Sequence, residues 1–344
     1  TLTGVIIYGL SFVGYIIPFI NLIMFFAAVI VAVNLTWKKL EFGVLLVIFE
    51  LILGAKGYLF SVAIGDSFVL SLRLTLFVIL MVAWLIYALR HKSLAIAKSP
   101  YFWPFIAGAG VGYFTGNPLS AIFFDANGYL YFALALPLFE VARNKGFGRR
   151  LLAVFLGGVL ALSFLSLFLF SDFYITKQWA RPSLTDSIAT ESASAEEAAA
   201  GKFAFGGIKN RLYDESGKPV EYRWQKDIGL GTISYVSGRF FRVFSSGQIW
   251  VLFGFLFAVF LFLRRWRRDR TQLWLAIFSL LSLATLFISF SRSFWIGAAG
   301  GLIFLLFFLP RKRSLLIAAA AILLIVILVA GSYFVAPQIY QTLS

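Results

Sequence analysis

Long apolar runs, separated by short clusters of basic residues, recur along this chain and restrict it to one kind of fold. Most runs approach the roughly 20 residues that an α-helix needs to cross the hydrocarbon core of a bilayer. Hydrophobic residues make up 61% of the 344 residues, and the mean hydropathy of +0.91 is well above that of soluble domains. The runs are too long and too continuous for the alternating strands of an outer-membrane barrel. The sequence therefore predicts an all-α, polytopic helical membrane protein.

About eleven apolar segments are predicted to be transmembrane helices. They comprise residues 2–17, 19–37, 42–60, 69–89, 101–118, 121–141, 151–170, 249–263, 273–290, 295–309 and 315–330. Pro18 divides the first two, which would otherwise form one long kinked helix. The polar stretch between the seventh and eighth segments predicts an N-terminal bundle over residues 1–170, one large outer loop over residues 171–246 and a C-terminal bundle over residues 247–344. The chain starts at Thr1 without a recognisable signal peptide, so we expect a fragment, cut at both ends and with its C-terminal bundle truncated.

Basic residues predict which ends of these segments face inward. Their clusters are Lys38 and Lys39; Arg90, Lys92 and Lys98; Arg143, Lys145, Arg149 and Arg150; Arg264, Arg265, Arg267, Arg268 and Arg270; and Arg311, Lys312 and Arg313. Alternation of the segments brings every cluster to the inner side, as the positive-inside rule requires. The net charge of +15 therefore reflects multi-pass topology in a plasma membrane, with anionic lipids of the inner leaflet rather than nucleic acid as partners.

The residue types present exclude several kinds of chemistry. The chain has no cysteine and a single histidine, His91, so it offers neither thiolate nor histidine-cluster metal sites. The inner side lacks the glycine-rich loop, GxxxxGK[ST], that binds nucleotide phosphates. We therefore expect no metal, no cofactor and no nucleotide-driven pump, and the polar groups available for function lie on the outer side.

Residues 286–301, LFISFSRSFWIGAAGG, contain the main candidate, Arg292, between two apolar segments. An arginine centred in the bilayer costs about 2.5 to 3.5 kcal/mol on insertion scales, so such residues normally reach water, a partner or an anionic ligand. Ser289, Ser291 and Ser293 offer hydroxyl groups beside it. Two interpretations stay open: Arg292 caps the carbonyl end of a helix and extends to the lipid headgroups, or it binds an anionic ligand.

Other charged residues divide in the same way between structural and functional interpretations. Arg73 lies just inside the outer end of its segment. Glu50 and Lys56 share a segment at a spacing that disfavours a direct pair, so we expect each to have a different partner. Asp125 and Asn127 open a segment, where they act either as helix N-caps or as site residues.

The polar stretch divides by composition. Residues 185–201 are small and acidic and predict a linker, whereas residues 203–224 predict a small hairpin. Residues 228–246 carry Arg239 and Arg242 beside two phenylalanines. This pattern is typical of an interfacial helix, and the alternative is that the two arginines hold phosphate oxygens.

Two stretches, FDANGYLYFALALPL at residues 124–138 and SFSRSFWIGA at residues 289–298, are similar to motifs of a known family. In this order they resemble an outer-end segment and the Ser-Arg-Gly segment of the O-antigen ligase and O-antigen polymerase superfamily of bacterial envelope glycosyltransferases. Asn127, Pro137, Ser291 and Arg292 match those motifs, while Asp125 and Ala126 replace the more usual Asn-Pro and Ser293 replaces the glycine.

The resemblance implies a metal-independent membrane glycosyltransferase of lipopolysaccharide biosynthesis. Such an enzyme takes a glycan from an undecaprenyl diphosphate carrier and joins it to an acceptor glycan or lipid A core at the outer face of the bacterial inner membrane. Arg292 is then expected to be catalytic, by stabilising charge on the diphosphate leaving group. The expected substrate-binding residues are Arg73, Asn127, Arg239, Arg242 and Ser291.

The catalytic base and two rival functions stay open. The family's base-like histidine lies in a large outer loop after the Ser-Arg-Gly segment, whereas this chain stops at Ser344. Either that loop is missing from this fragment, or the large outer loop lies earlier, at residues 171–246, and Asp66, Asp125 or an acid of that loop is the base. One rival is another lipid-linked-sugar transferase that uses an acid of the first outer loop, where Asp66 lies. The other is a transporter or flippase for a lipid-linked glycan.

Overall fold

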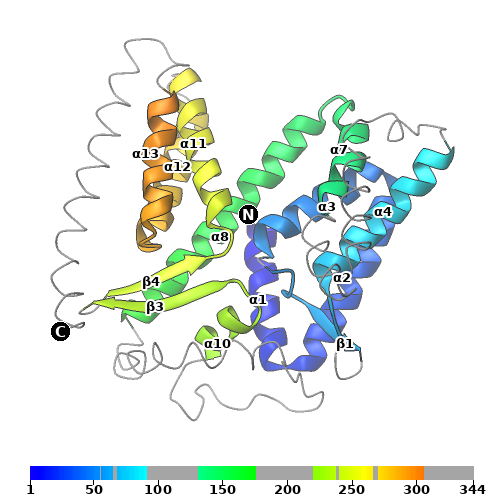
Figure 1. Cartoon of the computed structure of the whole chain (residues 1–344), viewed down its shortest axis with the longest axis horizontal. Coiled ribbons are helices and arrows are strands. Elements are labelled where there is room, and N and C mark those ends of the chain that lie inside the picture. Colours follow the sequence, from blue (N-terminus) through cyan, green and yellow to red (C-terminus); the bar gives the residue numbers. More distant parts are fainter. Residues whose placement is uncertain are drawn as a thin grey trace, which may run out of the picture.

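The computed structural model describes residues 1–54, 56–64, 68–90, 131–175, 220–237, 240–265 and 270–305, and these residues are mostly helical (Figure 1). The N-terminal helices are α1 (Leu2–Ile16), α2 (Pro18–Lys38), α3 (Leu40–Leu53) and α4 (Leu72–Arg90). The short η1 (Tyr131–Leu134) and α7 (Ala135–Ala142) precede the long α8 (Phe147–Ile175). After α10 (Val220–Asp227) come α11 (Gln248–Arg265), α12 (Arg270–Ile288) and α13 (Arg292–Leu305).

Four of the described helices, α2, α4, α8 and α12, are long and apolar enough to cross a membrane. Helices α1, α11 and α13 are apolar but shorter. The predicted segments at 101–118 and 315–330, and the first half of the segment at 121–141, lie outside the described residues. The helical membrane class is therefore supported, while the count of about eleven spans stays a prediction.

Proline ends the first helix where the sequence predicts. Ile17 has an extended backbone, because a residue before proline avoids the helical region, and Pro18 occupies the first turn of α2. The interpretation of residues 2–37 as two helices is confirmed, and the alternative of one long kinked helix is wrong.

The predicted segment at 42–60 is wrong in its outer third. Helix α3 ends at Leu53, and the chain then forms a turn and an antiparallel hairpin of β1 (Ser61–Ile64) and β2 (Phe68–Ser71). Gly54 follows the helix directly, and Gly57 has a φ of +89°, a backbone conformation that glycine adopts without strain. Lys56 consequently lies in this turn and not in a helix.

The polar stretch also departs from prediction. Residues 228–246 form no interfacial helix but, from Gly231, a second hairpin, β3 (Gly231–Ser237) and β4 (Phe240–Ser245). Ile233 and Val243 are paired across this hairpin, and both are buried against Leu169 and Phe173 of α8. One face of the hairpin therefore packs on the helix, as the alternating side chains of strands allow. The hairpin predicted over 203–224 is wrong at its end, where α10 forms, and its first part lies outside the described residues.

Helix α8 forms the centre of the bundle. It contacts α1 and α3 on one side and α11 and α12 on the other, and in Figure 1 it runs diagonally between these groups. It also extends past the predicted domain boundary at residue 170. The end of the polar stretch belongs to the same core, because Trp224 and Leu230 are buried within it and the Trp224 ring meets Phe12 edge-on at 5.4 Å. The described part of the outer loop is thus packed against the helices.

The two ends of the bundle differ in charge. Helices α2, α4 and α11 finish in Lys or Arg at the end where α8 begins, and Glu41 there forms an ion pair with Arg150 at 3.1 Å. Both hairpins and α10 lie at the opposite end (Figure 1). We call these the basic end and the hairpin end.

Candidate functional site

The described candidate residues lie at the hairpin end in two groups. Arg73 is in the first turn of α4, whereas Arg242 is on β4 and Ser291 and Arg292 are at the start of α13. Helix α8 separates α4 from α13 (Figure 1), so the structure does not unite all the predicted arginines. The remaining candidates, Asp66, Asp125, Asn127 and Arg239, lie outside the described residues.

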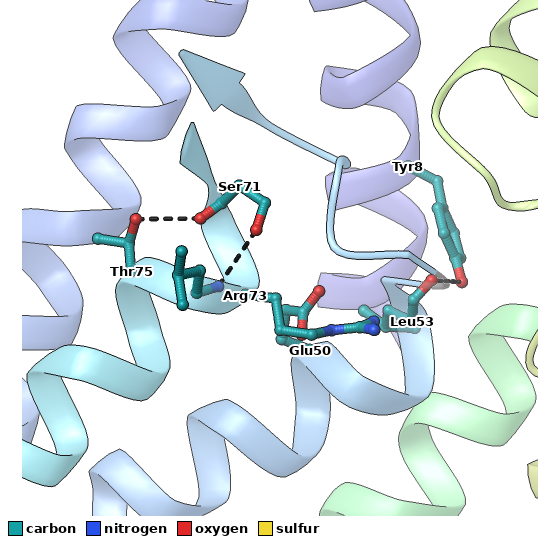
Figure 2. A network of polar contacts seen from close by, with 7 residues as sticks. Tyr8, Glu50, Leu53, Ser71, Arg73 and Thr75 are labelled. Carbon is teal, nitrogen blue, oxygen red and sulfur yellow. Dashed lines mark hydrogen bonds and ion pairs between the residues drawn. The ribbon is translucent and has the colours of Figure 1, made fainter. Parts of the chain in front are cut away.

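Arg73 is paired with Glu50 of α3, as Figure 2 shows. Its Nε donates to Glu50 Oε2 at 2.9 Å, and the exposed fractions of the two side chains are 14% and 5%. Within the described part of the chain, Arg73 Nη2 and Glu50 Oε1 are buried without hydrogen-bond partners. Glu50 and Lys56 do have different partners, as predicted, since Lys56 packs against Gly229. The pair therefore retains one donor group and one acceptor atom for a further contact.

The turn after α3 shapes this pair. A Cβ at Gly54 would overlap Glu50 Oε1, and a Cβ at Gly57 would lie 2.6 Å from the Cβ of Arg73. The backbone lies so close to the ion pair at Gly54 and Gly57 that a residue with a side chain would not fit at either position. Their role was not predicted from the sequence, although two glycines three residues apart in an apolar run are a recognisable interruption.

Polar side chains of α1 and α2 hold the backbone of the same turn. Tyr8 donates its hydroxyl to the carbonyl of Leu53 at 3.0 Å (Figure 2), and Ser11 donates to the carbonyl of Leu59 at 2.8 Å. The amide of Asn21 donates to the carbonyl of Ser61 at 2.7 Å. The three carbonyl groups have no partner within a helix, so these side chains supply their hydrogen bonds. Non-helical backbone inside an apolar bundle is stable only when its polar groups are paired in this way.

The α12–α13 turn presents Arg292. Ser289 and the indole of Trp295 both donate to the carbonyl of Leu286, at 2.6 and 2.8 Å, and Phe290 has a positive φ of 47°. Arg292, the first residue of α13, is exposed and has no hydrogen-bond or ion-pair partner among the described residues. The interpretation of Arg292 as a cap for the preceding helix thus has no hydrogen bond to support it in this structure.

Arg242 lies on β4, the strand whose Phe244 contacts α13. Its Nε donates to Ser234 Oγ at 3.2 Å, and its guanidinium carbon is 6.0 Å from the centre of the Phe244 ring. Phe244 in turn contacts Phe294 of α13, with ring centres 6.0 Å apart. We call Arg242, Ser291 and Arg292 the arginine site.

The residues of the arginine site come from stretches of the sequence that carry basic but no acidic residues. The sequence has no Asp or Glu from Ile228 to Arg268, nor from Arg270 to the end of the chain. The N-terminal end of a helix adds partial positive charge from its unpaired N–H groups, and α13 begins at Arg292. The arrangement favours a ligand with a local, strong negative charge, such as a phosphate.

An apolar groove of about 800 Å³ runs between α3, α8, α11 and α13. Aromatic side chains line it, among them Phe155, Trp250, Phe253 and Phe304. Helix α13 contributes to both features, since its first residue is in the arginine site and its last turns line the groove. Sequence patterns did not predict the groove, because it depends on how four helices pack.

The described residues contain no group of three or more His, Asp or Glu side chains that could hold a metal ion. Comparison with known proteins adds no assignment: no protein-family model matches the chain, and no curated protein or solved structure shows significant similarity to it.

Proposed function

We propose that the protein is a membrane glycosyltransferase of the O-antigen ligase or polymerase type. It transfers an oligosaccharide from an undecaprenyl diphosphate carrier to an acceptor glycan at the outer face of the bacterial inner membrane. The observation that carries the proposal is the arginine site, where Arg242 lies over the Phe244 ring, Phe244 contacts Phe294 of α13, and Arg292 begins that helix. The sequence has no acidic residue near these positions.

Guanidinium groups suit the chemistry of this leaving group. When the glycosidic bond to the carrier breaks, negative charge accumulates on the diphosphate oxygens, and fixed cations stabilise that charge in the transition state. Arginine presents several N–H donors in one plane and can contact two phosphate oxygens at once. Arg292 would contact the diphosphate as the catalytic residue, with Arg242 and Ser291 as binding partners.

The apolar groove supports a lipid-linked substrate. Gly301, Phe304 and Leu305 line it on the helix that begins with Arg292. Gly301 is nine residues beyond Arg292, about 14 Å along α13 at the usual helical rise. A polyprenyl chain in the groove would thus place its diphosphate toward the start of α13.

The acceptor hydroxyl needs a base as it attacks the sugar. Asp66 and Asp125 remain the proposed candidates, and Asn127 and Arg239 the further binding residues. Arg73 stays a proposed substrate-binding residue apart from the arginine site, since α8 lies between them; its Nε is bonded to Glu50, and its Nη2 has no hydrogen-bond partner among the described residues.

The test uses the full-length protein in proteoliposomes with an undecaprenyl diphosphate oligosaccharide and an acceptor glycan, and it follows both glycan length and released carrier. We expect Arg292→Ala to lower transfer by about 10²- to 10³-fold, the usual effect of removing one group that stabilises transition-state charge. Arg143→Ala is the matched control, because Arg143 is an exposed arginine at the basic end. Transfer by this control should equal that of the wild type.

Three outcomes would contradict the proposal. Normal transfer by Arg292→Ala would show that Arg292 is not catalytic and serves only to anchor the helix at the membrane surface. Loss of transfer in Asp66→Asn, with Arg292→Ala active, would favour the acid-dependent transferase. Movement of the lipid-linked glycan across the vesicle membrane without a new glycosidic bond would favour the transporter.

A further inference from the structure

A second cavity, of about 350 Å³, lies at the basic end, away from the arginine site. It opens between the ends of α2, α4 and α7 and the start of α3. Pockets for small ligands begin at about 300 Å³, so the space suits a compact polar group.

Charged residues of both signs line this cavity. The basic residues are Lys38, Lys39 and Arg90, and the acidic residues are Glu41 and Glu140. Glu41 is buried and its carboxylate is paired with Arg150 at 3.1 Å. No ion pair connects Glu140 to another described residue. The cavity therefore combines three cationic groups with one carboxylate that is not paired within the described chain.

Exposed apolar residues place the cavity at the level of lipid headgroups. Trp37, Leu89 and Phe139 precede Lys38, Arg90 and Glu140 in the sequence, and their exposed fractions are 64%, 60% and 74%. In a helical membrane protein, such side chains face acyl chains, and the adjoining basic residues meet the phosphates. A ligand here would have its apolar part along the outside of the bundle.

We propose that this cavity binds the headgroup of a phospholipid that carries a primary amine as well as a phosphate, of the phosphatidylethanolamine class. Lys38, Lys39 and Arg90 contact the phosphate, and Glu140 accepts a hydrogen bond from the ammonium group. A lipid with an uncharged glycerol headgroup lacks the ammonium group that would bind Glu140, so the repulsion between this carboxylate and the phosphate disfavours it.

The experiment measures lipid binding to the purified full-length protein by native mass spectrometry. Phosphatidylethanolamine and phosphatidylglycerol of identical acyl chains compete, and soluble phosphoethanolamine is added separately. We expect the wild type to prefer the ethanolamine lipid about tenfold, the typical effect of one hydrogen bond to a charged group. Glu140→Gln should abolish the preference, and the Lys39→Gln/Arg90→Gln double variant should weaken the binding of both lipids.

Lys145→Gln is the control, because Lys145 is exposed at the same end and does not line the cavity. It should leave the preference intact. Equal binding of the two lipids by the wild type, or an unchanged preference in Glu140→Gln, would overturn the proposal. If soluble phosphoethanolamine bound as tightly as the lipid, the ligand would be a free phosphate compound, and the assignment to a lipid would also be overturned.

Discussion

Arg73 is a candidate for function and also stabilises the fold through its ion pair with Glu50. Their ion pair joins α4 to α3 in an apolar interior, where either charge alone is costly. We expect Arg73→Ala to lower the free energy of unfolding by about 3 to 5 kcal/mol, because Glu50 is left as a buried, unpaired carboxylate. The Glu50→Leu/Arg73→Leu double variant should recover most of this loss, as measured by unfolding in mixed detergent micelles.

The double variant also separates stability from catalysis. If it folds normally but transfers no glycan, the pair takes part in transfer, as proposed for Arg73 in substrate binding. If it folds and transfers normally, the pair is structural only. Equal stability of the wild type and Arg73→Ala would show that the ion pair contributes nothing to the fold.

Among the elements, the turn between α3 and β1 is the one most dependent on its glycines. Gly57→Ala places a Cβ 2.6 Å from Arg73 and forces alanine to a φ of +89°, so we expect it to destabilise the protein by about 1 to 2 kcal/mol or more. Gly9→Ala in α1 is the control, because nothing lies within 4 Å of its Cβ. The control should be neutral or slightly stabilising. Thermal unfolding in detergent would compare them, and equal midpoints would contradict the packing argument.

Sequence patterns predicted the elements unevenly, for physical reasons. Pro18 marks the α1–α2 boundary, since its ring excludes the helical conformation of the residue before it. The end of α3 was missed because Leu59 and Phe60 are buried in the core without being helical, and hydropathy cannot separate the two cases. The β3–β4 hairpin was missed because arginines beside aromatic residues also occur in interfacial helices.

The candidate site was predictable only in part. In the sequence, Arg292 is a single charge between two apolar runs. In the structure it is exposed at the start of a helix, where a ligand can reach it. The Glu50–Arg73 pair joins residues 23 positions apart on different helices, so no local spacing reveals it. The contact between Phe244 of β4 and Phe294 of α13 likewise depends on how the hairpin packs against the helices, so the sequence does not reveal it.

At the scale of the whole molecule, the two ends carry different polar groups. Basic residues gather where α2, α4 and α11 finish, and the arginine site lies at the hairpin end. If the basic end faces the cytoplasm, as the positive-inside rule predicts, the arginine site faces outward, where lipid-linked glycans are joined to their acceptors. The proposed transfer depends on this orientation, since it takes place at the outer face, whereas the lipid cavity lies at the opposite end of the bundle.

Orientation can be measured directly because the chain contains no cysteine, so any cysteine introduced is unique. Thr232→Cys lies on the exposed side of β3, and Lys145→Cys lies in the exposed α7–α8 turn at the basic end. In intact bacterial spheroplasts, a membrane-impermeant maleimide should label Thr232→Cys at once and Lys145→Cys only after permeabilisation. The reverse pattern would place the arginine site in the cytoplasm, where neither a ligase nor a polymerase of this type could use it. Labelling of both before permeabilisation would mean that the ends of the bundle are not separated by the membrane.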